Sequence, residues 1–222
     1  MDFAHILLVS FAGGILALDA TSAGQFMVSR PLVAGVLTGS LLGDPAQGLL
    51  VGALLELYLL VSFPVGGARF PEGPTATVVA VASSLATPAA GAVPIAMAVG
   101  LVWGQIGGWT ITGLRRLNGH LVPEPAEAGA GPRRVVTAHL GALSLDFLRG
   151  ALVTVSGVLV GGYIVRATVE AWPISASDSI GLILVGGAVS LGILLRSLGG
   201  FKRRKAVFAV GMALGLAVVR FL

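Results

Sequence analysis

The feature that most constrains this chain is a succession of apolar runs that fills most of its length. The runs occupy residues 3–18, 31–43, 46–63, 75–90, 92–114, 150–165, 180–195 and 206–222. Only 11% of all residues are charged, whereas soluble domains carry about a quarter. About 20 apolar residues span the hydrocarbon of a bilayer, and helices satisfy their own backbone there. The sequence therefore predicts an all-α integral membrane protein, folded as a polytopic bundle.

Two of the runs, 31–43 and 75–90, are short for simple spans and are bordered or interrupted by glycine and proline. Short, broken segments of this kind are typical of re-entrant or discontinuous helices in transporters. Ordinary short helices would give the same pattern, and the sequence leaves both interpretations open. In either case the irregular helices are expected in the N-terminal half.

A polar, proline-rich linker at 115–134 divides the chain. It separates a predicted N-terminal membrane block, 1–114, from a C-terminal membrane block, 135–222. Arginines at both ends of the linker place it on the cytoplasmic side by the positive-inside rule, and a basic loop two spans later gives the same side. The loop around Trp172 is then expected on the outer, non-cytoplasmic side of the membrane.

Several kinds of chemistry are excluded by the composition. The sequence has no cysteine, so disulfides and thiolate catalysis are excluded. No metal-ligand spacing, Ser/His/Asp set or phosphate-binding glycine loop is present, so we predict no catalytic residue, no metal and no cofactor. The net charge is +4, but the basic residues gather at the ends of spans. That distribution favours membrane lipid as a partner over nucleic acid.

Glu56 is the most informative single residue, because a charge at the centre of a span costs about 2.5–3.5 kcal/mol. It shares a helix face with Gly48 and Gly52, since the three are spaced by four residues. In the functional interpretation, which we prefer, the carboxylate binds a ligand or a proton. In the structural interpretation it caps a broken helix or pairs with Arg30 or Arg69.

A second polar group follows the first apolar run and contains Asp19, Gln25 and Arg30. Carboxylate and amide groups supply the acceptors and donors that sugar hydroxyls need. The alternative is a loop that ends in a helix start. Arg69 and Glu72 lie farther along, in a glycine- and proline-broken connection that either lines a cavity or forms a surface loop.

Glycines recur at four-residue spacing in three places, and this spacing predicts close helix packing. The three sets are Gly35, Gly39 and Gly43; Gly48 and Gly52; and Gly100, Gly104 and Gly108.

The stretch 19–57 reads DATSAGQFMVSRPLVAGVLTGSLLGDPAQGLLVGALLEL. Its pattern of QF, RPLVAG, LGD and LEL resembles the signature region of the mannose/sorbose-type IIC subunit of the bacterial phosphoenolpyruvate-dependent sugar phosphotransferase system. The resemblance is weaker through 75–114 and returns at His139 and Arg149. It implies a fold with re-entrant hairpins and a core that shifts against a scaffold.

The resemblance also implies a function: a multi-pass permease subunit of the bacterial cytoplasmic (inner) membrane, which binds and translocates a sugar. The implied partners are a IID membrane subunit and IIA/IIB phosphocarrier proteins in a hetero-oligomer, and the chain itself carries no phosphorylated residue. Two alternatives stay open. One is a stand-alone ion-coupled secondary transporter with Glu56 as the proton carrier, and the other is a non-transporting membrane scaffold or sensor.

The motif match assigns substrate binding to Gln25, Arg30 and Glu56, with Asp19 beside them. Arg69 and Glu72 complete the predicted substrate-binding set. The family often has an aspartate after the proline where this chain has Glu72 after Pro71, so the sugar itself is not predicted.

Overall fold

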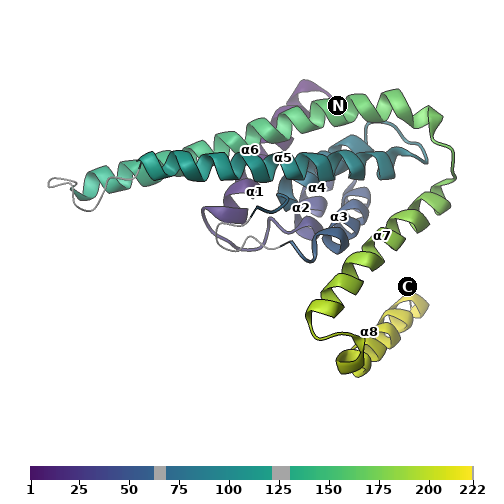
Figure 1. Ribbon diagram of the computed structural model, residues 1–222. Coiled ribbons are helices and arrows are strands. Elements are labelled where there is room, and N and C mark those ends of the chain that lie inside the picture. The colour runs from purple at the N-terminus through teal and green to yellow at the C-terminus, as the bar shows by residue number, and fades with distance from the viewer. Residues whose placement is uncertain (63–68, 122–130, 222) are drawn as a thin grey trace.

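The computed structural model describes residues 1–62, 69–121 and 131–221, and these are helical with short connections (Figure 1). The helices in chain order are α1 (Phe3–Thr21), α2 (Pro31–Leu41), α3 (Pro45–Leu59), α4 (Gly73–Ser84), α5 (Ala92–Leu121), α6 (Pro132–Thr168), the 3-10 helix η1 (Val169–Ala171), α7 (Ala176–Ser197) and α8 (Phe201–Phe221). Each apolar run of the sequence corresponds to one of the α-helices. The predicted all-α membrane bundle is therefore confirmed.

The helices fall into a long and a short group. Among the described residues, four helical stretches are long and apolar enough to cross a membrane: Phe3–Thr21, Ala92–Leu121, Pro132–Ala171 and Ala176–Ser197. By contrast, α2 has 11 residues, α3 has 15 and α4 has 12. The prediction of short helices in the N-terminal half is thus confirmed, and their interpretation as re-entrant or broken helices stays a prediction. Proline at the first turn of each short helix explains where it begins, since proline lacks the N–H that would be unpaired there.

The short helix α4 forms the centre of the molecule. All of its residues from Pro74 to Ser84 are buried, and it packs against α1, α2, α3, α5 and α6. Its buried valines contribute to two apolar clusters, one shared with α1 and α6 and the other with α3 and α7. Because α4 is enclosed on all sides, its N-terminal end lies inside the protein and needs polar partners there.

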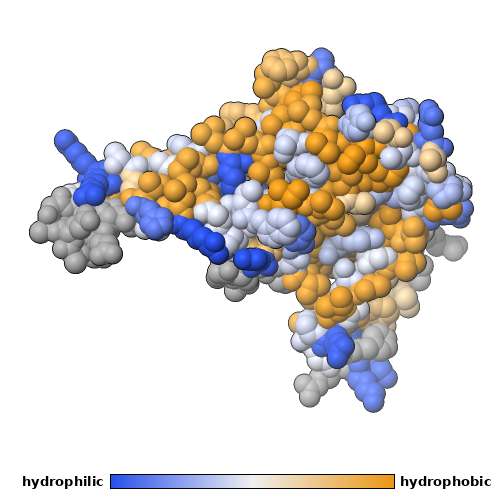
Figure 2. All heavy atoms as spheres, turned by 45° about the horizontal axis from the view of Figure 1, so that its top comes forward, coloured by the Kyte–Doolittle hydropathy of each residue, from blue (hydrophilic) through white to orange (hydrophobic). Residues whose placement is uncertain are grey.

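The helices α5 and α6 form an antiparallel pair that extends past the rest of the bundle (Figure 1). With 30 and 37 residues they are about 45 and 55 Å long at 1.5 Å per residue, longer than the hydrocarbon layer of about 30 Å. Apolar side chains cover the body of the molecule, and hydrophilic ones gather toward its extremities, including this projecting arm (Figure 2).

The predicted linker, 115–134, falls at the end of this arm. Helix α5 continues to Leu121 and α6 begins at Pro132, while residues 122–130 lie outside the described part of the chain. Helix α6 packs against α1, α4 and α5 of the N-terminal block. The functional division of the chain at this linker stays a prediction.

Helices α2 and α3 form a tight hairpin in which the predicted glycine faces meet each other. A Cβ atom added at Gly48 would lie 2.8 Å from the Cα of Gly39, and one added at Gly35 would lie 2.8 Å from the Cα of Gly52. Glycine is therefore required at these positions for the two backbones to approach so closely. The same holds for α5, where a Cβ at Gly100 would lie 2.8 Å from the Cβ of Ala80 on α4.

We expect Gly48→Val to destabilise the hairpin by about 1–3 kcal/mol, because the added side chain overpacks the α2–α3 contact. The measurement is the free energy of unfolding in detergent. Gly141→Val on α6 is the matched control, since a Cβ there meets nothing within 4 Å. Equal stability of the two variants would contradict the glycine interface.

Candidate functional site

A cavity of about 380 Å³ lies between the loop that follows α1 and the beginning of α4. Its polar lining includes Asp19, Gln25, Ser29 and Arg30. The opposite wall is formed by Phe70, Pro71, Gly73 and Pro74, which lead into and begin α4. The volume falls at the lower end of the range of about 300–1,000 Å³ that small-molecule sites occupy. Three of the side chains that the sequence singled out thus line one cavity.

The carboxylate of Asp19 holds the loop that forms this cavity wall. Asp19 is 6% exposed and lies in the last turns of α1. Its Oδ1 accepts a hydrogen bond from the Phe26 backbone N–H at 2.6 Å, and its Oδ2 accepts one from Ser29 N–H at 2.9 Å. Each carboxylate oxygen can accept a further bond. Asp19 therefore shapes the loop and keeps accepting capacity toward the cavity.

The loop has an unusual backbone at the residues that face the cavity. Gln25 has a φ of 54° and Met27 a φ of 65°, in the left-handed region. Non-glycine residues in this region cost of order 1–3 kcal/mol and cluster at ligand-binding sites. Gly24, with a φ of 86°, adopts the same region without that cost. The hydrogen bonds to Asp19 supply the constraint that keeps the loop in this conformation.

Glu56 does not line this cavity but pairs with a residue that does. Its Oε1 forms an ion pair with the guanidinium of Arg30, and its Oε2 accepts a hydrogen bond from the Leu32 backbone N–H at 3.2 Å. The carboxylate thus caps the first turn of α2 and orients Arg30. This is the contact that the structural interpretation of Glu56 describes. Its predicted role in binding sugar stays a prediction.

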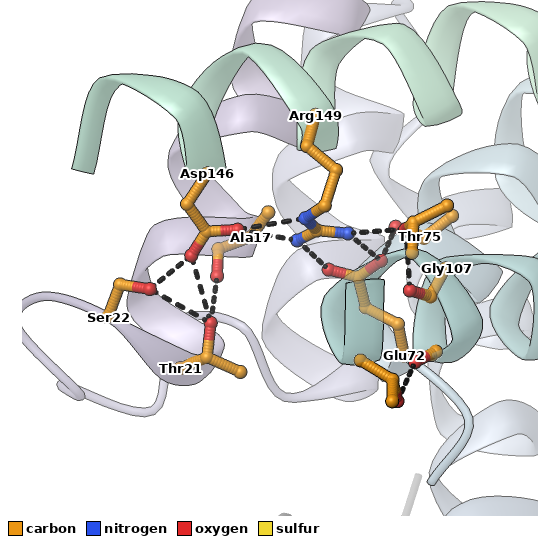
Figure 3. Close-up of polar contacts among 11 residues, drawn as sticks. Ala17, Thr21, Ser22, Glu72, Thr75, Gly107, Asp146 and Arg149 are labelled. Carbon is orange, nitrogen blue, oxygen red and sulfur yellow. Dashed lines mark hydrogen bonds and ion pairs between the residues drawn. The ribbon is translucent and has the colours of Figure 1, made fainter. Parts of the chain in front are cut away.

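Glu72 belongs to a buried charge cluster behind the cavity wall (Figure 3). It is fully buried, directly before α4, and the guanidinium of Arg149 binds it in a bidentate manner. Nη2 donates to Oε1 at 2.7 Å and Nη1 donates to Oε2 at 3.0 Å. The Thr75 hydroxyl donates to Oε2 at 2.7 Å. Glu72 does not line the first cavity, although residues on both sides of it do.

Asp146 completes the cluster and connects it to the loop. Its Oδ1 accepts a hydrogen bond from Arg149 Nε at 2.9 Å, and its Oδ2 accepts bonds from the hydroxyls of Thr21, at 3.1 Å, and Ser22. Thr21 and Ser22 end α1 and begin the loop of the cavity. The cluster therefore fastens both walls of the cavity, one through Glu72 and the other through Asp146 (Figure 3).

The sequence did not single out Asp146 as a site residue. The sequence feature that could have pointed to Asp146 is its three-residue spacing from Arg149, which places both charges on one helix face. Charges in an apolar helix need partners in the protein, but nothing in the local sequence named Glu72 as that partner. Among the described residues, no group of three acidic, histidine or cysteine side chains is arranged to hold a metal ion.

Arg69, the remaining predicted residue, lines a different cavity of about 220 Å³. Its other lining residues are Trp109, Thr112, Gly113 and Arg116. The six predicted residues are thus divided among the first cavity, its supporting ion pair, the buried cluster and this second cavity.

We expect Arg149→Met to lower the free energy of unfolding by about 3–5 kcal/mol, because it leaves two buried carboxylates without a positive partner. Arg133→Met is the matched control, since Arg133 is exposed on the same helix. The triple variant Glu72→Gln, Arg149→Met, Asp146→Asn should recover part of the loss because it leaves no buried charge. The free energy of unfolding in detergent is measured for all three variants. Equal stability of Arg149→Met and its control would contradict the cluster's role.

Comparisons with known proteins agree with this architecture. Residues 3–218 match the family described as the sorbose-specific IIC component of the phosphotransferase system. A sorbose-specific EIIC component of Klebsiella pneumoniae is 29% identical over 79% of this chain and 66% of its own length. A putative N-acetylgalactosamine permease IIC component 2 of Escherichia coli is 39% identical over 36% of this chain and 63% of its own length.

The chain spans no more than 66% of the length of these two relatives. A solved structure of a membrane protein has a TM-score of 0.65 at 20% identity and covers 100% of this chain and 96% of its own. That likeness shows the fold. The match over residues 3–218 shows the family, so the chain belongs to the family described as the sorbose-specific IIC component of the phosphotransferase system.

Proposed function

We propose that this chain is the membrane permease subunit of a bacterial sugar phosphotransferase system, and that its 380 Å³ cavity holds the sugar. The observation that carries the proposal is the convergence of Asp19, Gln25 and Arg30 on one cavity in a chain of this family. The names of the two relatives agree with this proposal. One is a sorbose-specific EIIC component of a phosphotransferase system, and the other is a putative N-acetylgalactosamine permease IIC component.

The cavity lining suits a polyhydroxylated ligand. Asp19 accepts hydrogen bonds, Gln25 both donates and accepts, and Arg30 donates, so neighbouring hydroxyls can each find a partner. Apolar atoms make up much of the remaining lining, including those of Met27, Leu59, Phe70 and the prolines at 31, 71 and 74. A site with a few fixed polar groups on an apolar surface is typical of small-molecule recognition.

In this proposal the sugar is translocated by this chain together with a IID membrane subunit. A IIB phosphocarrier, itself charged by IIA, phosphorylates the sugar on the cytoplasmic side. The chain would thus sit in the inner membrane as part of a hetero-oligomer and leave phosphoryl chemistry to its partners.

The class of transport can be tested directly with membrane vesicles. We expect uptake of labelled sorbose or N-acetylgalactosamine that requires phosphoenolpyruvate and the soluble phosphocarriers and that delivers the sugar phosphate. Uptake driven by a proton gradient alone would favour the secondary-transporter alternative. Absence of both uptake and binding for these sugars and mannose would favour the scaffold or sensor.

We expect Gln25→Ala to weaken sugar binding about five- to tenfold, the usual range for one or two lost hydrogen bonds. Gln105→Ala is the matched control, because Gln105 is exposed on α5 and lines neither cavity described above. Calorimetry on the purified chain measures both variants. Equal binding by both would remove Gln25 from the site.

Arg30 and Glu56 lend themselves to a double-mutant cycle. If Glu56 acts by orienting Arg30, then Glu56→Gln and Arg30→Gln should each reduce uptake strongly while the double variant is scarcely worse than either. Vesicle uptake measures the three variants, and immunoblotting of the membranes checks insertion. A separate loss from Glu56→Gln in the Arg30→Gln background would show instead that Glu56 itself binds sugar or a proton.

A further inference from the structure

The second cavity lies next to the first and has a different chemical character. The segment before α4 separates the two, since Phe70 and Pro71 line the first and Arg69 lines the second. The rest of the second cavity comes from residues 109–116 of α5. This part of α5 begins the projecting arm, which the positive-inside rule places on the cytoplasmic side.

Two guanidinium groups face this cavity from different elements. Arg116 and Thr112 are one helical turn apart on α5, and Trp109 precedes them on the same face. Arg69 comes from the segment before α4. No carboxylate is among the lining residues that the structure describes. The cavity therefore has a net positive lining within about 220 Å³.

The charged residues next to this cavity in the sequence are engaged elsewhere. The guanidinium carbon of Arg115 lies 5.7 Å from the centre of the Phe70 ring, which lines the first cavity. Glu72 is close in sequence, but its carboxylate is fully buried and is engaged by Arg149 and Thr75. Neither Arg69 nor Arg116 forms an ion pair with any carboxylate in the described ranges. An anion between them would relieve the repulsion of like charges.

We propose that this second cavity binds the phosphate group of a phosphate ester. Guanidinium groups bind phosphate oxygens in a bidentate manner, and two of them from separate elements can hold one phosphate from two sides. The Thr112 hydroxyl donates to the Gly108 carbonyl at 3.1 Å, so the two guanidinium groups supply the donors, and the Trp109 ring offers an apolar face to the rest of the ester. The ester is either a soluble sugar phosphate or a lipid headgroup, since both present the same group.

The soluble source is tested with purified chain in a neutral detergent. Mannose 6-phosphate and inorganic phosphate are the probes, and mannose is the reference without the charge. We expect both phosphates to bind, with affinity that falls as salt is raised. Arg69→Gln and Arg116→Gln should each weaken binding about tenfold, the loss expected for one charge-assisted contact. Arg133→Gln on the same arm removes the same charge away from the cavity and should leave affinity unchanged.

The lipid source is tested with the same variants reconstituted in nanodiscs that contain phosphatidylcholine with or without phosphatidylglycerol. Native mass spectrometry counts the phosphatidylglycerol molecules that stay bound. Retention in the wild type and in Arg133→Gln, with loss in Arg69→Gln and Arg116→Gln, supports the proposal with a lipid as ligand. Displacement of the bound phosphatidylglycerol by added mannose 6-phosphate supports the proposal with a sugar phosphate as ligand.

The proposal is overturned if neither the phosphates nor phosphatidylglycerol depend on Arg69 and Arg116 more than on Arg133. Both arginines are exposed, so the variants should fold, and their melting temperatures check this. The proposal does not require the first cavity to bind sugar. Binding of sorbose, N-acetylgalactosamine and mannose is measured in the same preparations, so failure of the phosphate site and failure of the permease assignment are seen separately.

Discussion

The bidentate contact between Arg149 and Glu72 is the interaction on which the rest of the structure depends. Removing a charge from water costs several kcal/mol per ion, and this is offset only when geometry and additional hydrogen bonds are good. Here one arginine on α6 is shared by Glu72 and Asp146, and hydroxyl groups from α1 and α4 satisfy the remaining oxygens. The cluster therefore requires α1, α4 and α6 to meet at one level of the bundle.

This cluster in turn depends on glycines. A Cβ atom added at Gly107 of α5 would lie 2.9 Å from the Cβ of Glu72, and the carbonyl oxygen of Gly104 accepts a hydrogen bond from Glu72 N–H at 2.8 Å. A larger residue at Gly107 would displace the carboxylate from Arg149, and one at Gly104 would push against Ala76 at the beginning of α4. In lipid there is little hydrophobic force between helices, so close backbone packing and polar contacts are what hold them together. The glycine interfaces and the buried charges are two parts of one arrangement.

Much of the fold follows from local features of the sequence. Apolar runs, prolines at first turns and glycines at four-residue spacing predict the helices and the faces that pack. Asp19, Gln25 and Arg30 could be grouped because they are neighbours in the chain. Glu72 and Arg149 could not, because they are 77 residues apart and many partners are compatible with a buried charge. For Glu56, a ligand-binding role and a helix-capping role both predict a glutamate at this place in the apolar run. The sequence therefore cannot distinguish the two roles, and the contact with Arg30 is seen only in the structure.

The Arg149 cluster and the Arg30–Glu56 pair, which both lie near the first cavity, differ in the free energy needed to separate their charges. This difference bears on how the cavity can open. The Arg149 cluster is almost completely buried, with side-chain exposures of 9% for Arg149, 2% for Asp146 and 0% for Glu72. Breaking a buried pair costs about 3–5 kcal/mol. The Arg30–Glu56 pair is 35% and 20% exposed, and water can replace part of its contact.

If the first cavity holds the sugar as we propose, alternating access requires the walls of this cavity to separate. The loop wall and the α4 wall are joined by the buried cluster, so separating these walls would break buried ion pairs. Helices α2 and α3 are joined to each other by glycine contacts at 35, 39, 48 and 52, which makes the hairpin rigid in itself. The more exposed Arg30–Glu56 pair joins the residue before α2 to α3, and so it lies at the base of the hairpin itself. Displacing the hairpin from α4 therefore separates none of the buried ion pairs that the structure describes.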